Sequence, residues 1–150
     1  MTDTATIFGS PAPLDDHTYN PEIASGAGDF PICTPVRQST TLGQGGRVQP
    51  ASASESNGAN LVGLAAATGI EGQSVRVILA GPLEATADQW DAVTGDSGGL
   101  VTASPYYVGT TAGTLTTDVL SAPGTRVAAV GIALSPTVMM IQISYFTLNS

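Results

Sequence analysis

Glycine and proline interrupt the apolar runs of this chain, and this punctuation limits what it can fold into. The 150 residues include 18 glycines and 10 prolines. The strand-like segments at residues 73–80, 126–134 and 138–143 are short and are bounded by Gly, Pro, Asp or Ser. Short β-prone segments between turn residues are typical of a compact all-β domain. We therefore predict a small β-barrel or β-sandwich with no helix beyond about three turns.

One short stretch, residues 85–92 around Trp90, allows a helical turn. Thr86 is suited to cap its N-terminus, and Gln89 stands three residues later, at the second position of a capping box. We expect a helix there and no long helix elsewhere.

Two segments of similar sequence indicate an internal repeat. Residues 61–66 read Leu-Val-Gly-Leu-Ala-Ala, and residues 129–134 read Ala-Val-Gly-Ile-Ala-Leu. Each is followed by a turn and by a strand with β-branched residues, at 75–79 and at 138–143. The pattern favours two similar hairpin-like units that face each other, and chance similarity is the alternative because there are only two copies.

Residues 1–28 predict an extended arm in front of a β-rich domain at residues 29–150. Prolines at positions 11, 13 and 21 disfavour a continuous helix or a central strand. The arm is either an unattached terminus or a segment that lies along a neighbour and inserts isolated apolar side chains. The anchors expected for such binding are Ile7, Phe8, Leu14, Tyr19 and Ile23.

The strand expected at residues 138–145 is apolar on both faces. Such a strand is either central in a sandwich or covered by another subunit. Cyclic closure is a common way to cover such a face, so we expect a homo-oligomer. The residues expected in the core or in a subunit interface are Trp90, Tyr107, Val130, Met140 and Ile141.

The charge of the chain argues against nucleic acid and membrane as partners. The formal net charge is −8, and the four cationic residues are all arginine. Such a chain has no basic patch for phosphates or anionic lipids. The longest apolar run, residues 127–134, is far shorter than the roughly 20 residues that span a bilayer. The N-terminus lacks the basic and apolar regions of a signal peptide, so we expect a protein made and used without export.

Residues 95–99 read Gly-Asp-Ser-Gly-Gly, which resembles the segment around the nucleophile of chymotrypsin-like serine proteases. That motif places a serine hydroxyl beside backbone N–H groups that hold an oxyanion. The only histidine, His17, lies in the arm and at a spacing unlike that family's. Since Asp, Ser and Gly also build tight turns, we interpret the motif as a turn and expect no enzyme activity from Ser97.

Metal and cofactor sites are not expected either. Cys33 is the single cysteine, and one Cys with one His cannot build a zinc site. The acids Asp88, Asp91 and Asp96 could be imagined as paired catalytic carboxylates, but we interpret them as solvated loop residues. Cys33 cannot form an internal disulfide and is expected to be a small buried side chain.

The second half of the chain carries a series of short motifs. In chain order, they are Asp-Gln-Trp-Asp-Ala-Val-Thr-Gly at 88–95, Gly-Gly-Leu at 98–100, Pro-Tyr-Tyr-Val at 105–108, Gly-Thr-Leu-Thr-Thr at 113–117, Gly-Thr-Arg-Val at 124–127 and Val-Gly-Ile-Ala-Leu-Ser at 130–135. This series resembles a module that recurs in structural proteins of tailed bacteriophages. Upstream, residues 62–65 and 72–77 resemble the first half of tailed-bacteriophage capsid decoration proteins, also called head-stabilising or cement proteins, which have a small β-barrel body. The likeness covers about residues 28–143.

The resemblance implies a structural virion protein that folds in the host cytoplasm and binds the exterior of the assembled capsid. Its partners would be the major capsid protein and further copies of itself, as a homotrimer at three-fold or quasi-three-fold sites. It would need no catalytic group and no cofactor. Two other classes stay open: a tail, spike or fibre module that binds a host glycan or another virion protein, and an enzyme that uses Ser97.

Overall fold

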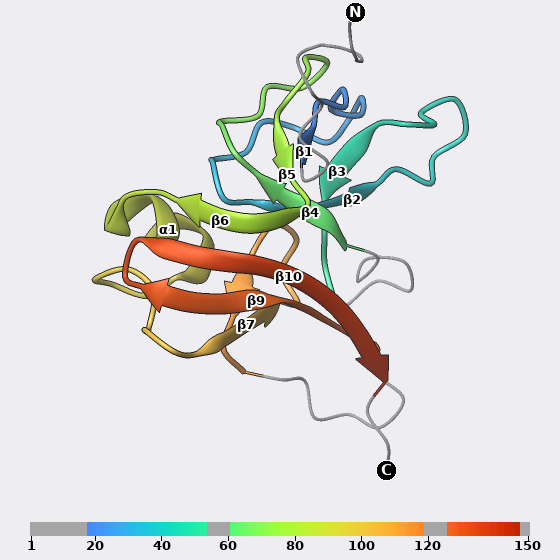
Figure 1. Cartoon of the computed structure of the whole chain (residues 1–150). Helices are drawn as coiled ribbons and strands as arrows, with labels where there is room; N and C mark the ends of the chain where they lie inside the picture. Colours follow the sequence, from blue (N-terminus) through green and yellow to red (C-terminus); the bar gives the residue numbers. More distant parts are fainter. Residues whose placement is uncertain (1–17, 54–60, 119–125, 148–150) are drawn as a thin grey trace, which may run out of the picture.

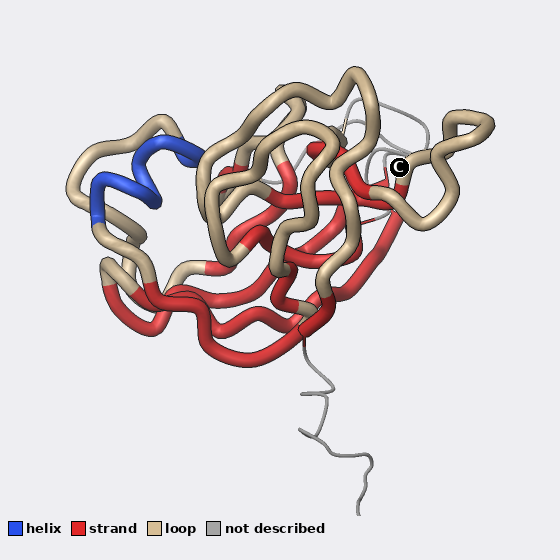
Figure 2. Tube along the Cα trace, turned by 90° about the horizontal axis from the view of Figure 1, so that it is seen from above, coloured by secondary structure: helices blue, strands red, loops and turns tan. Residues whose placement is uncertain are grey.

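The computed structural model of the chain describes residues 18–53, 61–118 and 126–147. It confirms the predicted all-β class, because the described residues form two antiparallel sheets of five strands each and one short helix (Figure 1). The strands gather along one side of the molecule, and the helix lies at one end (Figure 2).

The two sheets are formed by successive halves of the chain. The first sheet has the order β1-β5-β4-β2-β3 and the second has the order β6-β10-β9-β7-β8, with α1 (Ala87–Thr94) between β6 and β7. The strands of the first sheet are β1 (Thr18–Tyr19), β2 (Pro35–Gln38), β3 (Val48–Pro50), β4 (Leu61–Ala65) and β5 (Val77–Ile78). Those of the second are β6 (Ala80–Glu84), β7 (Pro105–Val108), β8 (Leu115–Thr116), β9 (Arg126–Ser135) and β10 (Val138–Thr147).

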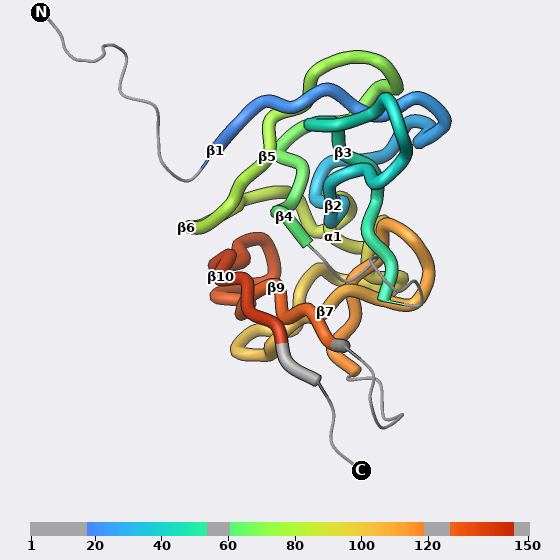
Figure 3. The backbone as a smooth tube through the Cα atoms, turned by 90° about the vertical axis from the view of Figure 1, so that its right-hand side faces the viewer, coloured from blue at the N-terminus to red at the C-terminus, as the bar shows by residue number. Residues whose placement is uncertain are grey.

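The two halves share one topology. If β1 is matched with β6, β2 with β7 and so on to β5 with β10, the order of strands in the two sheets is identical. The structure thereby confirms the internal repeat that the sequence indicates, and extends it from one hairpin to five strands. Figure 3 shows β2 to β5 on one side of the molecule and β7, β9 and β10 on the other.

The strands of the repeated motif also carry the same irregularity. The register of β4 with β2 shifts at Val62, next to Gly63, and that of β9 with β7 shifts at Val130, next to Gly131. A β-bulge of this kind inserts one extra residue and bends the strand. A Cβ on either glycine would collide with a backbone carbonyl of the following strand, β5 or β10, so both positions require glycine.

In each half, a residue with a positive φ angle lies shortly before the proline that begins β2 or β7. Cys33 has φ 76° and Ala103 has φ 67°, and they are the only non-glycine residues with positive φ in the described part. Each stands two positions before a proline that begins a strand, Pro35 or Pro105. The residue directly before a proline is restricted to extended conformations, so the chain turns one residue earlier. Each also donates its N–H to a carbonyl of the central strand, at 2.8 Å in both halves.

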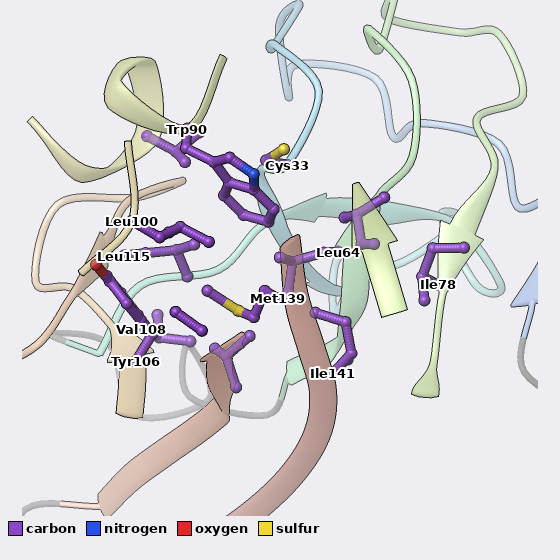
Figure 4. Close-up of a cluster of buried hydrophobic side chains, with 14 of the residues drawn as sticks. Cys33, Leu64, Ile78, Trp90, Leu100, Tyr106, Val108, Leu115, Met139 and Ile141 are labelled. Atoms are coloured by element: carbon purple, nitrogen blue, oxygen red, sulfur yellow. The ribbon is translucent and has the colours of Figure 1, made fainter. Parts of the chain in front are cut away.

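The main core lies between the two sheets. Leu64 and Ile78 of the first sheet are opposite each other in register, and both belong to the buried cluster that includes Tyr106, Met139 and Ile141 of the second sheet (Figure 4). The first sheet therefore packs on the inner face of the second.

A second, smaller core covers the other face of the first sheet. The connection from β1 to β2, residues 20–34, inserts Ile23 and Phe30 against Val36 and Val77. The matching connection in the second half, from β6 to β7, contains α1 and buries its side chains on the second sheet's inner face. Both faces of the first sheet and the inner face of the second are thus covered.

The helix α1 begins and ends as its sequence predicts. The Thr86 hydroxyl accepts the Gln89 N–H at 3.2 Å, and the Gln89 side chain accepts the Thr86 N–H at 2.8 Å, which confirms the capping box. Gly95 ends the helix in a left-handed conformation with φ 78°. Trp90 is fully buried, and its indole N–H donates to the carbonyl oxygen of Thr137, in the turn between β9 and β10, at 2.9 Å.

The arm that we expected over residues 1–28 ends earlier than residue 28. Thr18 and Tyr19 form β1 in the first sheet, and Ile23 is fully buried in the second core. The backbone N–H of Gly28 also donates to the Glu71 carboxylate at 2.7 Å. Residues 18–28 therefore belong to the β-rich body, because β1 and the following turn complete the same five-strand motif as β6 and its connection.

We predict that Ala103→Gly stabilises the protein. A left-handed conformation costs an L-residue about 1–2 kcal/mol, while the added freedom of glycine in the unfolded chain costs about 0.4–1 kcal/mol. The free energy of unfolding should rise by about 1 kcal/mol in chemical denaturation. Ala67→Gly, also exposed but without a positive φ, should lower it by about 0.5 kcal/mol. Equal losses in both variants would contradict the proposed strain at Ala103.

Trp90→Ala should be among the most damaging single changes. It empties a fully buried site and removes the hydrogen bond to Thr137. We expect the free energy of unfolding to fall by about 3–5 kcal/mol, as measured by denaturant titration. Trp90→Phe, which keeps an aromatic ring, should lose clearly less. A loss within error for Trp90→Ala would show that α1 does not hold the second sheet.

Candidate functional site

The face of the second sheet that points away from the first sheet is open in the described part of the chain. We call it the outer face and define it by a row of four residues with Tyr107 and Gln142 beside it. Pro82, Met140, Ile132 and Pro105 form the row, because each is opposite the next across β6, β10, β9 and β7. Residues opposite each other in a sheet share a face. Ile132 is 48 % exposed, Pro82 and Pro105 are exposed, and Met140 is half-buried.

A shallow groove of about 390 Å³ runs along the outer face. Its lining combines apolar side chains with three polar groups: the amide of Gln142 and the hydroxyls of Tyr107 and Ser144. Among the residues that the structure describes, no charged one lines the groove. Glu84, at the end of the edge strand β6, is two residues beyond Pro82 and therefore on the same side.

An exposed apolar surface of this kind is suited to another protein surface. Continuous exposed apolar patches are unusual on soluble monomers and mark sites where a protein, a membrane or a ligand binds. The core of protein interfaces is also depleted in charged residues and enriched in Tyr and Met, which both occur here. Because the chain as a whole is acidic, the uncharged lining that the described residues give this groove stands out, with Glu84 at the edge of the face.

The structure separates the residues that we expected in the core or in a subunit interface. Trp90, Val130 and Ile141 are buried, with exposures of 0 %, 0 % and 1 %. Tyr107 and Met140 are half-buried, and they lie on the outer face. The first three are therefore core residues, and the last two belong to the candidate surface.

The expected arm anchors are also divided. Ile7, Phe8 and Leu14 lie outside the described residues. Tyr19 is half-buried and packs on the second core, and its burial raises the pKa of its phenol. Ile23 is fully buried in that core. Within the described part, these two residues act as anchors inside their own chain.

Sequence reasoning did not single out Ile132, Leu134, Pro82 or Pro105, all of which are exposed. The apolar character of both faces of β10 was a usable signal, and β9 has the same property. The sequence alone could not tell which of the two faces the rest of the chain covers.

The Gly-Asp-Ser-Gly-Gly segment forms the end of α1 and the turn that follows it. The carboxylate of Asp91, one helical turn earlier, accepts the N–H groups of Gly98 at 3.1 Å and Gly99 at 2.9 Å. The backbone N–H groups of Gly98 and Gly99, which an oxyanion would need as donors, are thus already engaged by an internal carboxylate. Ser97 is exposed, and His17 lies outside the described residues.

Two further kinds of chemistry find little support in the described residues. Cys33 is fully buried, and burial raises the pKa of its thiol to about 12, so it is protonated at neutral pH. No group of three or more His, Cys, Asp or Glu side chains that could hold a metal ion occurs in the part of the chain that the structure describes. In the same part, α1 is too short and too polar to cross a bilayer, and it is the only helix.

Comparison with known proteins does not assign the chain to a family. No family model matches it, and no curated protein matches it significantly.

We predict that Asp91, and not Ser97, is the important side chain of this turn. Asp91→Ala removes two hydrogen bonds to a charged acceptor and should lower the free energy of unfolding by about 1–2 kcal/mol. Ser97→Ala should change it by less than about 0.5 kcal/mol, because the side chain is exposed. Asp96→Ala, an exposed acid in the same turn, is the control for the loss of negative charge. Labelling of Ser97 by a fluorophosphonate would overturn the interpretation as a turn.

Proposed function

We propose that this chain is a structural protein of a tailed-phage virion. It binds the outside of the assembled capsid and stabilises it by bridging neighbouring capsid subunits. The observation that supports a binding role is the outer face, a largely apolar surface with an uncharged groove among the described residues of an otherwise acidic protein. Such a surface is suited to contact with another protein, and a contact of this kind requires no catalytic group.

The order of the sequence motifs supports the phage class in particular. The motifs that resemble decoration proteins fall on α1, on the turn at residues 95–100, and on β7, β8 and β9. These elements build most of the second sheet, whose outer face is the candidate surface. Most of the motifs that carry the resemblance therefore lie in the same half of the molecule as the candidate surface.

Stabilising a shell requires only differential affinity. A protein that binds assembled capsid more tightly than free subunits shifts the equilibrium toward the assembled state. A site that spans two capsid subunits exists only after assembly, and it provides this preference. The partners in this proposal are the major capsid protein and further copies of the chain. The three-fold order that the resemblance implies stays a prediction.

Residues 1–17 would supply a second contact in this proposal. They contain the anchors Ile7, Phe8 and Leu14 among prolines, and they precede the body directly at β1. A buried anchor contributes roughly 1.5–3 kcal/mol, from which the cost of ordering the segment is subtracted. Binding through this segment should therefore depend steeply on how many anchors are buried.

A module of a tail, spike or fibre is the second candidate. The observation that favours it is a groove of about 380 Å³ beside β8, lined by five threonines and Asp118. Hydroxyls and a carboxylate can form hydrogen bonds with a sugar. No aromatic residue lines this groove among the described residues, which therefore offer no stacking platform for a glycan, and we rank this function second.

The capsid proposal predicts that the purified chain binds phage heads that lack it. The double variant Ile7→Asp/Phe8→Asp should reduce occupancy on particles at least about 10-fold, because each lost anchor is worth more than the 1.4 kcal/mol of a tenfold change. The control Thr4→Asp/Thr6→Asp adds the same charge at polar positions and should bind nearly as well as the wild type. Occupancy is measured by cosedimentation and by cryo-electron microscopy of the particles.

Two outcomes would contradict this reading. Equal occupancy for both double variants would show that residues 1–17 are not anchors. Density for the chain at the tail, or selective binding to a glycan array without binding to heads, would replace the capsid function by the second candidate.

A further inference from the structure

The internal repeat allows the outer face to be compared with its counterpart inside the same molecule. In the first sheet, Leu64 and Ile78 occupy the positions that Ile132 and Met140 occupy in the second, because their registers match strand for strand. Leu64 is 0 % exposed and Ile78 is 9 % exposed, whereas Ile132 is 48 % exposed. The same face of the same motif is thus buried in one half and open in the other.

The structure shows what covers the corresponding face of the first sheet. The face with Leu64 and Ile78 packs against Met139 and Ile141, on the inner face of the second sheet. Figure 4 shows these side chains between the two sheets. In the first half of the chain, this face is therefore covered by another sheet of the same fold.

We propose that the outer face is covered by the outer face of a second copy of this chain. In the first half of the chain, a sheet of the same fold covers the face with Leu64 and Ile78. The described part of a second copy has one sheet face that is still open for such a contact. Both faces of its first sheet and the inner face of its second sheet are already occupied among the described residues. The contact is therefore made by identical surfaces, which gives a two-fold dimer with the sheets packed face to face.

The chemistry of the outer face fits pairing with itself. Each copy has a net charge of −8, so two copies repel each other at long range. At physiological ionic strength this repulsion is screened beyond about 8 Å, and the groove itself carries no charge that would be buried. Gln142 and Ser144 each carry a donor and an acceptor, so identical groups can bond across a two-fold axis.

This inference does not depend on capsid binding, because it concerns the free protein. It also differs from the expected three-fold order. A ring of three copies would need the outer face to meet a different surface, and the described part of the chain offers no second open sheet face.

Sedimentation equilibrium of the full-length wild-type chain should give twice the mass of the monomer. Ile132→Glu should raise the dissociation constant at least about 100-fold, since it places a pair of like charges in the contact. Ile70→Glu is the matched control, because Ile70 is 46 % exposed and lies in the loop between β4 and β5. The Ile70→Glu variant should stay dimeric. Thermal melting of dilute samples verifies that both variants are folded.

A charge exchange tests the two-fold geometry directly. Ile132→Glu and Ile132→Lys should each be monomeric alone, and an equimolar mixture should form a dimer that contains one copy of each. Such rescue requires that position 132 of one copy faces the same region of the other. A monomeric wild type, a trimer, or a dimer that Ile132→Glu leaves intact would overturn the proposal. Cover by the chain's own residues 1–17 would appear as a monomeric wild type.

Discussion

The inner face of the second sheet packs against two different elements, and the rest of the structure depends on these two contacts. It packs against the first sheet through Met139 and Ile141, and it also receives α1 through Trp90. The indole N–H of Trp90 and the backbone N–H of Ala85 both donate to the carbonyl of Thr137, so the turn between β9 and β10 is fixed to the residue that follows β6 and to the middle of α1. Because this one face takes both the helix and the other sheet, none of the described elements covers the opposite face.

Local signals made much of the fold predictable. The alternation of apolar residues indicated strands, Thr86 and Gln89 located the helix, and the two Val-Gly segments revealed the repeat, because each depends on residues that are close in sequence. The end of the arm was less predictable. Pro21 argued against a central strand, but β1 is a two-residue edge strand that ends before it, and Ile23 is buried by contacts with distant residues. Periodicity likewise assigned Met140 and Ile141 to opposite faces without telling which face is covered.

The repeat explains why an apolar outer face exists at all. Leu64 and Ile132 are both large and apolar, and so are Ile78 and Met140, although only the first of each pair is buried by the fold. If folding alone required these side chains, the open positions could be polar at no cost to the core. The packing of the described residues therefore does not account for their apolar character, and this supports the proposal that the outer face is a contact surface.

The two edge strands of the second sheet, β6 and β8, determine whether another strand can pair with it. Since the Ala85 N–H points toward β10, strand alternation turns the backbone of Pro82 and Glu84 to the open edge of β6. Pro82 has no N–H to offer there, and Glu84 adds a charge, both of which hinder the addition of another strand. The other edge, β8, is only two residues long. With both edges blocked, further strands cannot extend the sheet, and a partner is directed to the outer face, where contact is made through side chains.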